Sequence, residues 1–264
     1  MRNGKTGVLR LKSQTLLACI AVLLTTGCVT PMVETKRVVA DSKSYLAESF
    51  TLTQLSPTVQ AAVTKGSSLS PRFRTMRINF IAETESDGKK QEIAGVRDLN
   101  NIGNGYIQTR TEFSRNAIPY RVNLELSFLG LVRLKDQIIY LARTNGEVPF
   151  EVKEIKRFDR EVANPVKGTT YLFESRYGSS GQLANFYQDT RSCTAGEAFQ
   201  ASSLHSVFSG RAVSLECSLI AESSVAFGKE KWAYLEDYGV AWQIESASSK
   251  STAVMKIVDV SITR

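Results

Sequence analysis

Apolar and polar residues alternate with a period of two along most of the chain after residue 74. The clearest stretch runs from Tyr120 to Phe128, where every second residue is apolar and the intervening ones are polar. Because successive side chains of a strand point to opposite faces, this stretch predicts a strand with one buried and one solvated face. The same pattern predicts strands over residues 75–83, 106–113, 169–177, 212–219, 231–235, 240–244 and 254–262.

One short helix is predicted ahead of the first strand. Ser56 is a suitable cap, Pro57 suits the first turn, and Gly66 provides a stop after the stretch from Thr58 to Lys65. No other segment gives an equally clear helical signal.

Turn residues divide the predicted strands at short intervals, as at Asp87-Gly88 and Tyr238-Gly239. Short strands without helices between them favour antiparallel over parallel pairing. The sequence therefore predicts a mostly β fold, either an antiparallel β-sandwich or a half-open β-barrel, with one short N-terminal helix. Residues 51–264 are expected to form a single domain, because either half alone would have a thin core.

The amino terminus has the layout of a secretory signal. Four basic residues and no acidic ones occupy positions 1–12, and an apolar run follows over residues 16–24. A membrane-spanning helix needs about 20 apolar residues, so this run is too short to serve as a permanent anchor. Residues 1–27 are expected to be a signal peptide.

The apolar run ends in Leu24-Thr25-Thr26-Gly27-Cys28, which resembles the lipobox of bacterial lipoproteins. In that family the cysteine thiol receives a diacylglyceryl group, the signal is cut just before it, and the new terminus is usually acylated, for example with palmitate. The resemblance implies a lipid on Cys28 and a tether over residues 28–50. It covers only the first 28 residues and departs from the family at Thr25, where leucine is commonest. An ordinary cleaved signal with an incidental cysteine is the alternative.

Position 29 bears on the target membrane. In many Gram-negative lipoproteins an aspartate after the lipidated cysteine retains the protein in the inner membrane, whereas this chain has Val29. The resemblance therefore implies the periplasmic face of the outer membrane. Stable anchoring takes more than one acyl chain, which a fully acylated Cys28 would supply. The expected partners are this membrane and other envelope proteins.

Two of the four cysteines remain once the signal is removed and Cys28 is acylated. Cys193 and Cys217 are then a single pair, and the oxidising periplasm favours a disulfide between them. A metal site or a redox pair is the alternative. A metal site would need more ligands, and His205 is the only histidine near them.

Charge and motifs exclude several functional classes. The chain is +7, but the signal carries four of these charges, which leaves 7 − 4 = +3 for the mature part. This charge is too weak to indicate nucleic-acid binding. Phosphate-loop, zinc-protease, calcium-loop and nucleophile-elbow patterns are missing from the sequence, and His205 has no identified catalytic partner. We therefore expect no enzyme activity, no catalytic residue, no metal and no cofactor.

One segment resembles a ligand surface in composition. Two adjacent acids lie among four aromatic residues, and aromatic rings beside acids are typical of sugar-binding surfaces. Adjacent residues of a strand point to opposite faces, so the two acids converge only if a turn brings them together. Packing of the aromatics across a hairpin is the alternative interpretation. The candidate surface consists of Trp232, Tyr234, Glu236, Asp237, Tyr238 and Trp242.

Three functions remain open from the sequence. The first is a non-enzymatic envelope lipoprotein with a binding or assembly role. The second is a carrier of lipid or another apolar ligand, held against residues such as Leu124, Leu126, Phe128, Ile138 and Ile139. The third is a hydrolase of a cell-wall polymer that uses Glu236 or Asp237.

Overall fold

The computed structural model describes residues 35–264, apart from 67, 71, 144–147 and 223–224. The signal segment and Cys28 therefore lie outside the described residues. The described residues form one compact unit. Among the described helices, none has the length and apolar character needed to cross a membrane.

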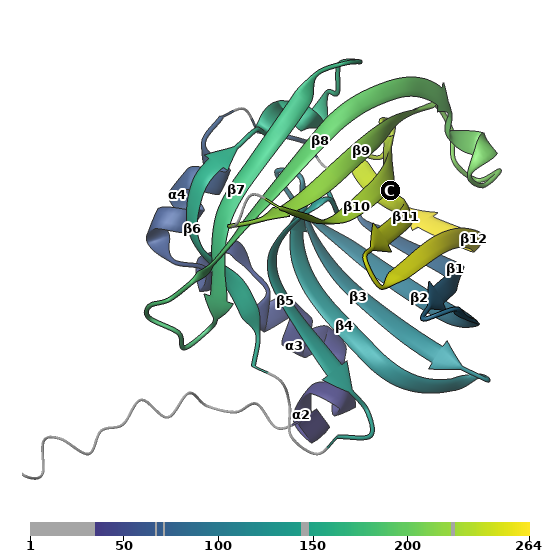
Figure 1. The fold of residues 1–264 in the computed structure, drawn as a ribbon, viewed down its shortest axis with the longest axis horizontal. Coiled ribbons are helices and arrows are strands. Elements are labelled where there is room, and N and C mark those ends of the chain that lie inside the picture. The colour runs from purple at the N-terminus through teal and green to yellow at the C-terminus, as the bar shows by residue number, and fades with distance from the viewer. Residues whose placement is uncertain (1–34, 67, 71, 144–147, 223–224) are drawn as a thin grey trace, which may run out of the picture. The chain divides into compact units, whose positions relative to one another are not determined.

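Twelve antiparallel strands in the described residues form a closed barrel, shown in Figure 1. Each strand pairs with its neighbours in the chain, and β1 pairs with β12 along its whole length. The strands are β1 (Thr75–Ser86), β2 (Lys89–Gly103), β3 (Tyr106–Arg115), β4 (Ile118–Phe128), β5 (Val132–Tyr140), β6 (Phe150–Phe158), β7 (Thr170–Ser179), β8 (Tyr187–Gln200), β9 (Arg211–Ala221), β10 (Ala226–Leu235), β11 (Val240–Ser248) and β12 (Ser251–Thr263).

The closed sheet corrects the predicted architecture. The mostly β composition is confirmed, but the prediction of a sandwich or a half-open barrel was wrong, because β12 returns to pair with β1 and closes the sheet. Nothing in the local pattern of either strand indicates that the two will pair. Closure pairs the outer edge of β1, which an open sheet would expose.

The predicted helix is present as α4 (Pro57–Thr64), and the Ser56 hydroxyl accepts a hydrogen bond from the Val59 amide at 3.4 Å. Residues 35–49 differ from the expected tether, because they form α2 (Thr35–Ala40) and α3 (Ser42–Ser49). Short helices depend on tertiary packing for stability, which here comes from burial of Val38 and Leu46. Three 3-10 turns complete the helical elements: η1 (Leu52–Gln54), η2 (Arg160–Ala163) and η3 (Ala201–Ser203).

Helix α3 covers the outer face of β3 and β4. The Gln108 amide of β3 donates to the carbonyls of Leu46, at 3.3 Å, and Phe50, at 3.1 Å. Gln108 lies opposite Leu126 in the sheet, so both side chains share the face beneath the helix. The apolar side of β4 is therefore buried outside the barrel wall rather than within the barrel.

The turn between β4 and β5 crosses to the far wall of the barrel. The Leu129 carbonyl accepts from the Ala241 amide of β11 at 2.7 Å, and the Leu131 carbonyl accepts from Arg191 of β8 at 2.7 Å. The Tyr177 hydroxyl of β7 donates to the carbonyl of Arg133 at 2.7 Å. These bonds hold the turn inside the barrel.

Two apolar clusters share the interior and the helix-covered wall. One joins α3, α4 and β4 to β7–β10, and the other joins β1–β3 to the joined ends of β10 and β11. The β10–β11 segment contributes to both, since Tyr234 belongs to the first cluster and Trp242 to the second. This segment is consequently buried on both faces.

Candidate functional site

The four aromatic residues of the predicted ligand surface are core residues. Trp232 is 6% exposed, and Tyr234, Tyr238 and Trp242 are each 2% exposed. The Tyr234 hydroxyl donates to the Ala163 carbonyl at 2.8 Å. The hairpin-packing interpretation accounts for these rings, because they fill both sides of the β10–β11 end.

The two acids of that segment make separate contacts. Arg211 donates to both carboxylate oxygens of Glu236, at 2.6 and 2.9 Å. The Asp237 carboxylate accepts from the Ser209 hydroxyl at 3.0 Å. Each carboxylate has its own partner at the β8–β9 connection, so the two do not form a convergent acid–base pair.

Residue His205 has a local structural role. It lies between η3 and β9, where its Nδ1 accepts from the Val207 amide at 3.4 Å. Its ring packs edge-on against Phe208 with centroids 6.4 Å apart. Across the described residues, no group of three or more histidine, cysteine, aspartate or glutamate side chains is arranged to hold a metal ion.

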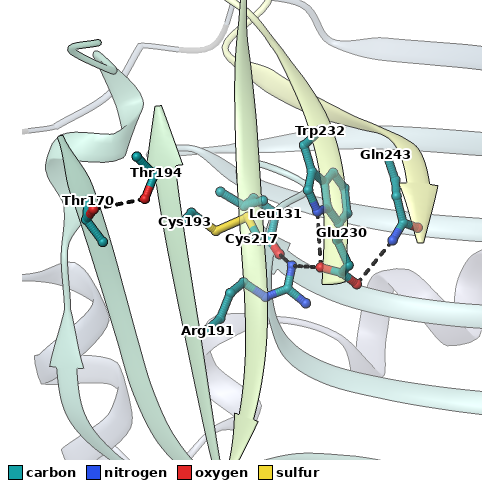
Figure 2. Close-up of a disulfide and its surroundings, with 9 residues drawn as sticks. All are labelled: Leu131, Thr170, Arg191, Cys193, Thr194, Cys217, Glu230, Trp232 and Gln243. Carbon is teal, nitrogen blue, oxygen red and sulfur yellow. Dashed lines mark hydrogen bonds and ion pairs between the residues drawn. A yellow bond between two sulfur atoms is a disulfide. The ribbon is translucent and has the colours of Figure 1, made fainter. Parts of the chain in front are cut away.

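Cys193 and Cys217 form the expected disulfide, which joins β8 to β9 (Figure 2). The two residues are directly opposite each other in the sheet and are fully buried. Beside them, the Thr170 and Thr194 hydroxyls are hydrogen-bonded at 2.9 Å across β7 and β8. The covalent link therefore stiffens the middle of the β7–β9 wall.

Figure 2 also shows the Glu230 carboxylate, which is surrounded by donors. Arg191 pairs with it at 2.9 Å, and the Trp232 indole and the Gln243 amide each donate to it at 3.1 Å. The side chains of Arg191 and Glu230 are only 15% and 12% exposed. Three donors fix the position of this carboxylate, as expected for a buried charge that must be paired.

Glu230 is part of a charged band across the barrel interior. The Arg97 guanidinium lies over the Phe80 and Trp242 rings and interacts with Glu125 of β4. Charges of β5 on the near wall interact with those of β8 on the far wall, for example Arg133 with Asp189. The band consists of Arg97, Glu125, Arg133, Asp136, Asp189, Arg191 and Glu230.

Burial perturbs the acids of this band. It raises the pKa of Asp136 to about 6, with Glu125 acting in the same direction and Arg133 opposing the shift. Burial also raises the pKa of Asp189, against the opposing effect of Arg191. Such shifts occur at functional sites and also in structural ion-pair networks.

The size of the cavity at this band distinguishes a functional site from a structural ion-pair network. It is enclosed by Val132, Phe173, Ser175, Tyr177 and the neighbouring charges, and its volume is about 10 Å³. Pockets for small-molecule ligands are typically about 300–1,000 Å³. We therefore interpret the charged band as a structural network that joins the two walls.

A larger hollow lies on the outer face of β8–β12, with a volume of about 650 Å³. Two rows of directly paired residues cross it. The first row is Thr194, Glu216, Lys231, Glu245 and Val254, and the second is Ser192, Ser218, Lys229, Ala247 and Thr252. We call these ten residues the outer groove.

The charged residues of the outer groove are exposed. Lys231 lies between Glu216 and Glu245 in the first row, and Lys229 is in the second. Within the described part of the chain, none of the recorded ion pairs or side-chain hydrogen bonds involves these four charged groups. Their polar ends are thus available to a ligand, and the short serine, threonine and alanine side chains leave room beside them.

The sequence missed this groove for a physical reason. Its residues are spread over five strands, two of which, β8 and β9, are separated by a long connection. Alternation identifies the outward face of one strand, but only the pairing register brings the rows together. The alternation in β9, β10 and β12 was a local signal for single strands, and it did not indicate how the strands are aligned.

Comparisons with known proteins leave the family undetermined. No family model matches the chain, and no curated protein matches its sequence. Three solved structures share part of the fold. A β-barrel-like protein of the DUF1849 domain from Brucella abortus has a TM-score of 0.47 and 9% identity, over 74% of this chain and all of that one (100%).

The other two structures have lower TM-scores. A DUF1329 family protein from Desulfovibrio piger has a TM-score of 0.37 and 8% identity, over 72% of this chain and 86% of that one. The hypothetical lipoprotein YmcC from Escherichia coli has a TM-score of 0.37 and 9% identity, over 79% of this chain and 97% of that one. Similarity at this level assigns neither family nor function.

Proposed function

We propose that this chain is a non-enzymatic lipoprotein of the bacterial envelope, which binds a partner protein through its outer groove. In this proposal the lipid on Cys28 holds it at the periplasmic face of the outer membrane. The observation that carries the binding role is the juxtaposition of four exposed charges, Lys229, Lys231, Glu216 and Glu245, that do not pair with one another.

A polar protein segment suits this groove. Opposite charges directly across a sheet ordinarily attract each other, with Cβ atoms about 5 Å apart. Here Lys231 lies directly opposite both Glu216 and Glu245 without forming an ion pair closer than 4 Å, and Lys229 lies in the adjacent row, opposite Ser218 and Ala247. A partner with charges of both signs would complete these contacts and gain specificity from their arrangement.

The two other functions have weaker support. The apolar residues suggested for a carrier include Leu124, Leu126 and Phe128, which are buried in the cluster that contains α3 and α4 rather than around a cavity. The hydrolase depended on Glu236 and Asp237, which have separate partners. We therefore propose neither activity.

Photo-crosslinking in living cells tests the binding role. A diazirine amino acid is placed at Thr194 or Thr252 in the groove, and at exposed Val258 on β12 as the matched control. We expect both groove positions to give an adduct with the same envelope protein, and the control to give none. The double variant Lys229→Glu, Lys231→Glu should abolish that adduct.

Three outcomes would contradict the proposal. Equal labelling from Val258 would show that the contact is not confined to the groove. Persistence of the adduct in the charge-reversed variant would show that binding does not depend on the groove lysines. An adduct whose added mass is removed by glycan-cleaving enzymes would replace the protein partner with a glycan.

A further inference from the structure

The largest exposed apolar side chains gather at one end of the barrel. We define the hairpin end as the end where β1 turns into β2, β3 into β4, β7 into β8, and β9 into β10. Leu183 and Tyr187, at the β7–β8 turn, are 84% and 66% exposed. Val225 and Phe227, at the β9–β10 turn, are 63% and 50% exposed.

These four residues lie at two turns of the hairpin end, and we call them together the apolar rim. Strands β8 and β9 are paired up to Asp189 and Ala221, immediately beside the two turns. The Ala221 amide also donates to the Val225 carbonyl at 3.2 Å, which fixes the start of β10 next to the end of β9. Exposed large apolar side chains that gather at one end of a molecule in this way are typical of interaction surfaces.

The amino-terminal helices begin at this same end. Strand β3 runs toward the hairpin end, from Tyr106 to Arg115. The Arg110 guanidinium, in mid-strand, donates to the Ser42 hydroxyl at 2.8 Å, whereas the Tyr106 hydroxyl donates to the Val63 carbonyl at 2.6 Å. The chain thus enters near the hairpin end and runs along β3 toward the opposite end.

The distance from Cys28 to this entry point is short. Cys28 precedes Thr35 by seven residues, a reach of about 25 Å at full extension. A membrane that holds the lipid on Cys28 would therefore lie within this reach of Thr35. The hairpin end, with its apolar rim, is the end of the barrel nearest that entry point.

We infer that the apolar rim rests on the lipid bilayer, with Leu183 and Phe227 entering its interfacial region. The inference rests on the lipid anchor of the proposed function. Burial of these side chains in the interface removes apolar area from water, and tyrosine is favoured at this depth because its ring is amphipathic. A lipid chain and a protein contact together fix orientation, which a flexible lipid tether alone would leave free.

Fluorescence quenching in vesicles tests the inference. The acylated full-length mature protein has no free thiol once Cys28 is lipidated and the disulfide is formed, so an introduced cysteine is labelled alone. The fluorophore NBD is attached in the variants Leu183→Cys and Phe227→Cys. The control is Val166→Cys, which is 63% exposed at the opposite end, between β6 and β7. Vesicles of phosphatidylcholine contain lipid with a doxyl quencher near the headgroup.

We expect blue-shifted emission from the two rim labels, and at least about twofold stronger quenching than for the control, as for groups buried roughly 5–10 Å into the interface. Rim labels that behave like the Val166→Cys label would overturn the inference. Quenching at all three positions would also overturn it, because it would show an unoriented domain.

A second preparation separates this inference from the anchor itself. A hexahistidine tag replaces Cys28 and binds vesicles through nickel-chelating lipids. If mass spectrometry finds no acyl group on Cys28, the proposed anchor fails, and the tagged protein still reports the orientation of the rim. Selective quenching of the rim labels in the tagged protein would support the rim contact, and its loss would reject it.

Discussion

Arg191 and Glu230 form an ion pair at 2.9 Å within the barrel, and the same guanidinium donates to the Leu131 carbonyl at 2.7 Å. This relationship joins β8, β10 and the β4–β5 turn through one side chain. Arg191 thereby holds the β4–β5 turn against the far wall of the barrel, and Glu230 holds Arg191 in place.

Glu230→Gln should therefore be strongly destabilising. The substitution leaves Arg191 buried without its carboxylate, and breaking a buried pair in this way costs about 3–5 kcal/mol. The measurement is the free energy of unfolding in urea at neutral pH. The matched control is Glu236→Gln, whose partner Arg211 is 62% exposed, and which should cost less than about 1 kcal/mol. Equal losses for the two variants would contradict a special role for the interior pair.

Stability should fall as the pH rises from about 4 to about 6 through the contribution of Asp136. Its pKa is raised from 3.8 to about 6, so the folded protein binds this proton more tightly than the unfolded chain in that window. At about 1.4 kcal/mol per pKa unit, the loss is about 2–3 kcal/mol. Urea unfolding at a series of pH values measures it.

The variant Asp136→Asn isolates this contribution. It should flatten the dependence on pH by that amount, because asparagine does not titrate. The control is Asp87→Asn in the exposed β1–β2 turn, which makes the same exchange of carboxylate for amide outside the barrel interior. A profile for Asp136→Asn that parallels the wild type would assign the pH dependence to other groups.

Removal of the disulfide should destabilise the fold without changing it. In the chain-entropy model, a link between residues 24 positions apart contributes about 3 kcal/mol. The variant with Cys193→Ser and Cys217→Ser should lower the urea midpoint accordingly and keep the far-ultraviolet circular dichroism of the native barrel. Unchanged stability would show that the β8–β9 pairing suffices by itself.

Native mass spectrometry of residues 29–264, produced in a bacterial periplasm, should yield the bare chain. The interior cavity at the charged band is about 10 Å³, far below the volume of a lipid. Release of the chain from the periplasm by osmotic shock, without detergent, preserves a bound apolar ligand if one is present. A retained adduct of lipid mass would restore the carrier function.

The sequence predicted individual strands better than their arrangement. Each segment chosen for its alternation falls in a strand of the barrel, including Tyr120–Phe128 in β4. The apolar face of β4 is buried as predicted, but its polar face was assigned wrongly to solvent. Its apolar side lies beneath α3, and its polar side, with Asn123 and Glu125, faces the interior. Because this face carries polar and charged residues, the sequence pattern indicated that it is solvated, whereas it faces the barrel interior.

Two of the missed strands, β6 and β8, have interruptions in their alternation. The register of β6 shifts between Val152 and Glu154 and again between Ile155 and Arg157, and that of β8 shifts between Ala195 and Ala198. Each bulge reverses the faces of the residues that follow it. A period of two therefore persists for only a few residues at a time, too few to identify a strand.

The candidate site was less predictable than the strands. The aromatic residues around Glu236 attracted attention through composition, but composition does not distinguish a core ring from an exposed one. The outer groove consists of ordinary polar residues such as Thr194 and Lys231, and its significance comes only from the register of five strands.

Pairing of β1 with β12 along their whole length has a consequence for the order of folding. A chain is synthesised from its amino terminus, so β1 emerges long before the strand that completes its hydrogen bonds. Until Thr252 and the residues after it are available, the outer edge of β1 is a free template for other strands. Truncation at the carboxyl terminus would therefore do more than shorten the barrel: it would leave a persistent adhesive edge and make aggregation the dominant fate of the chain.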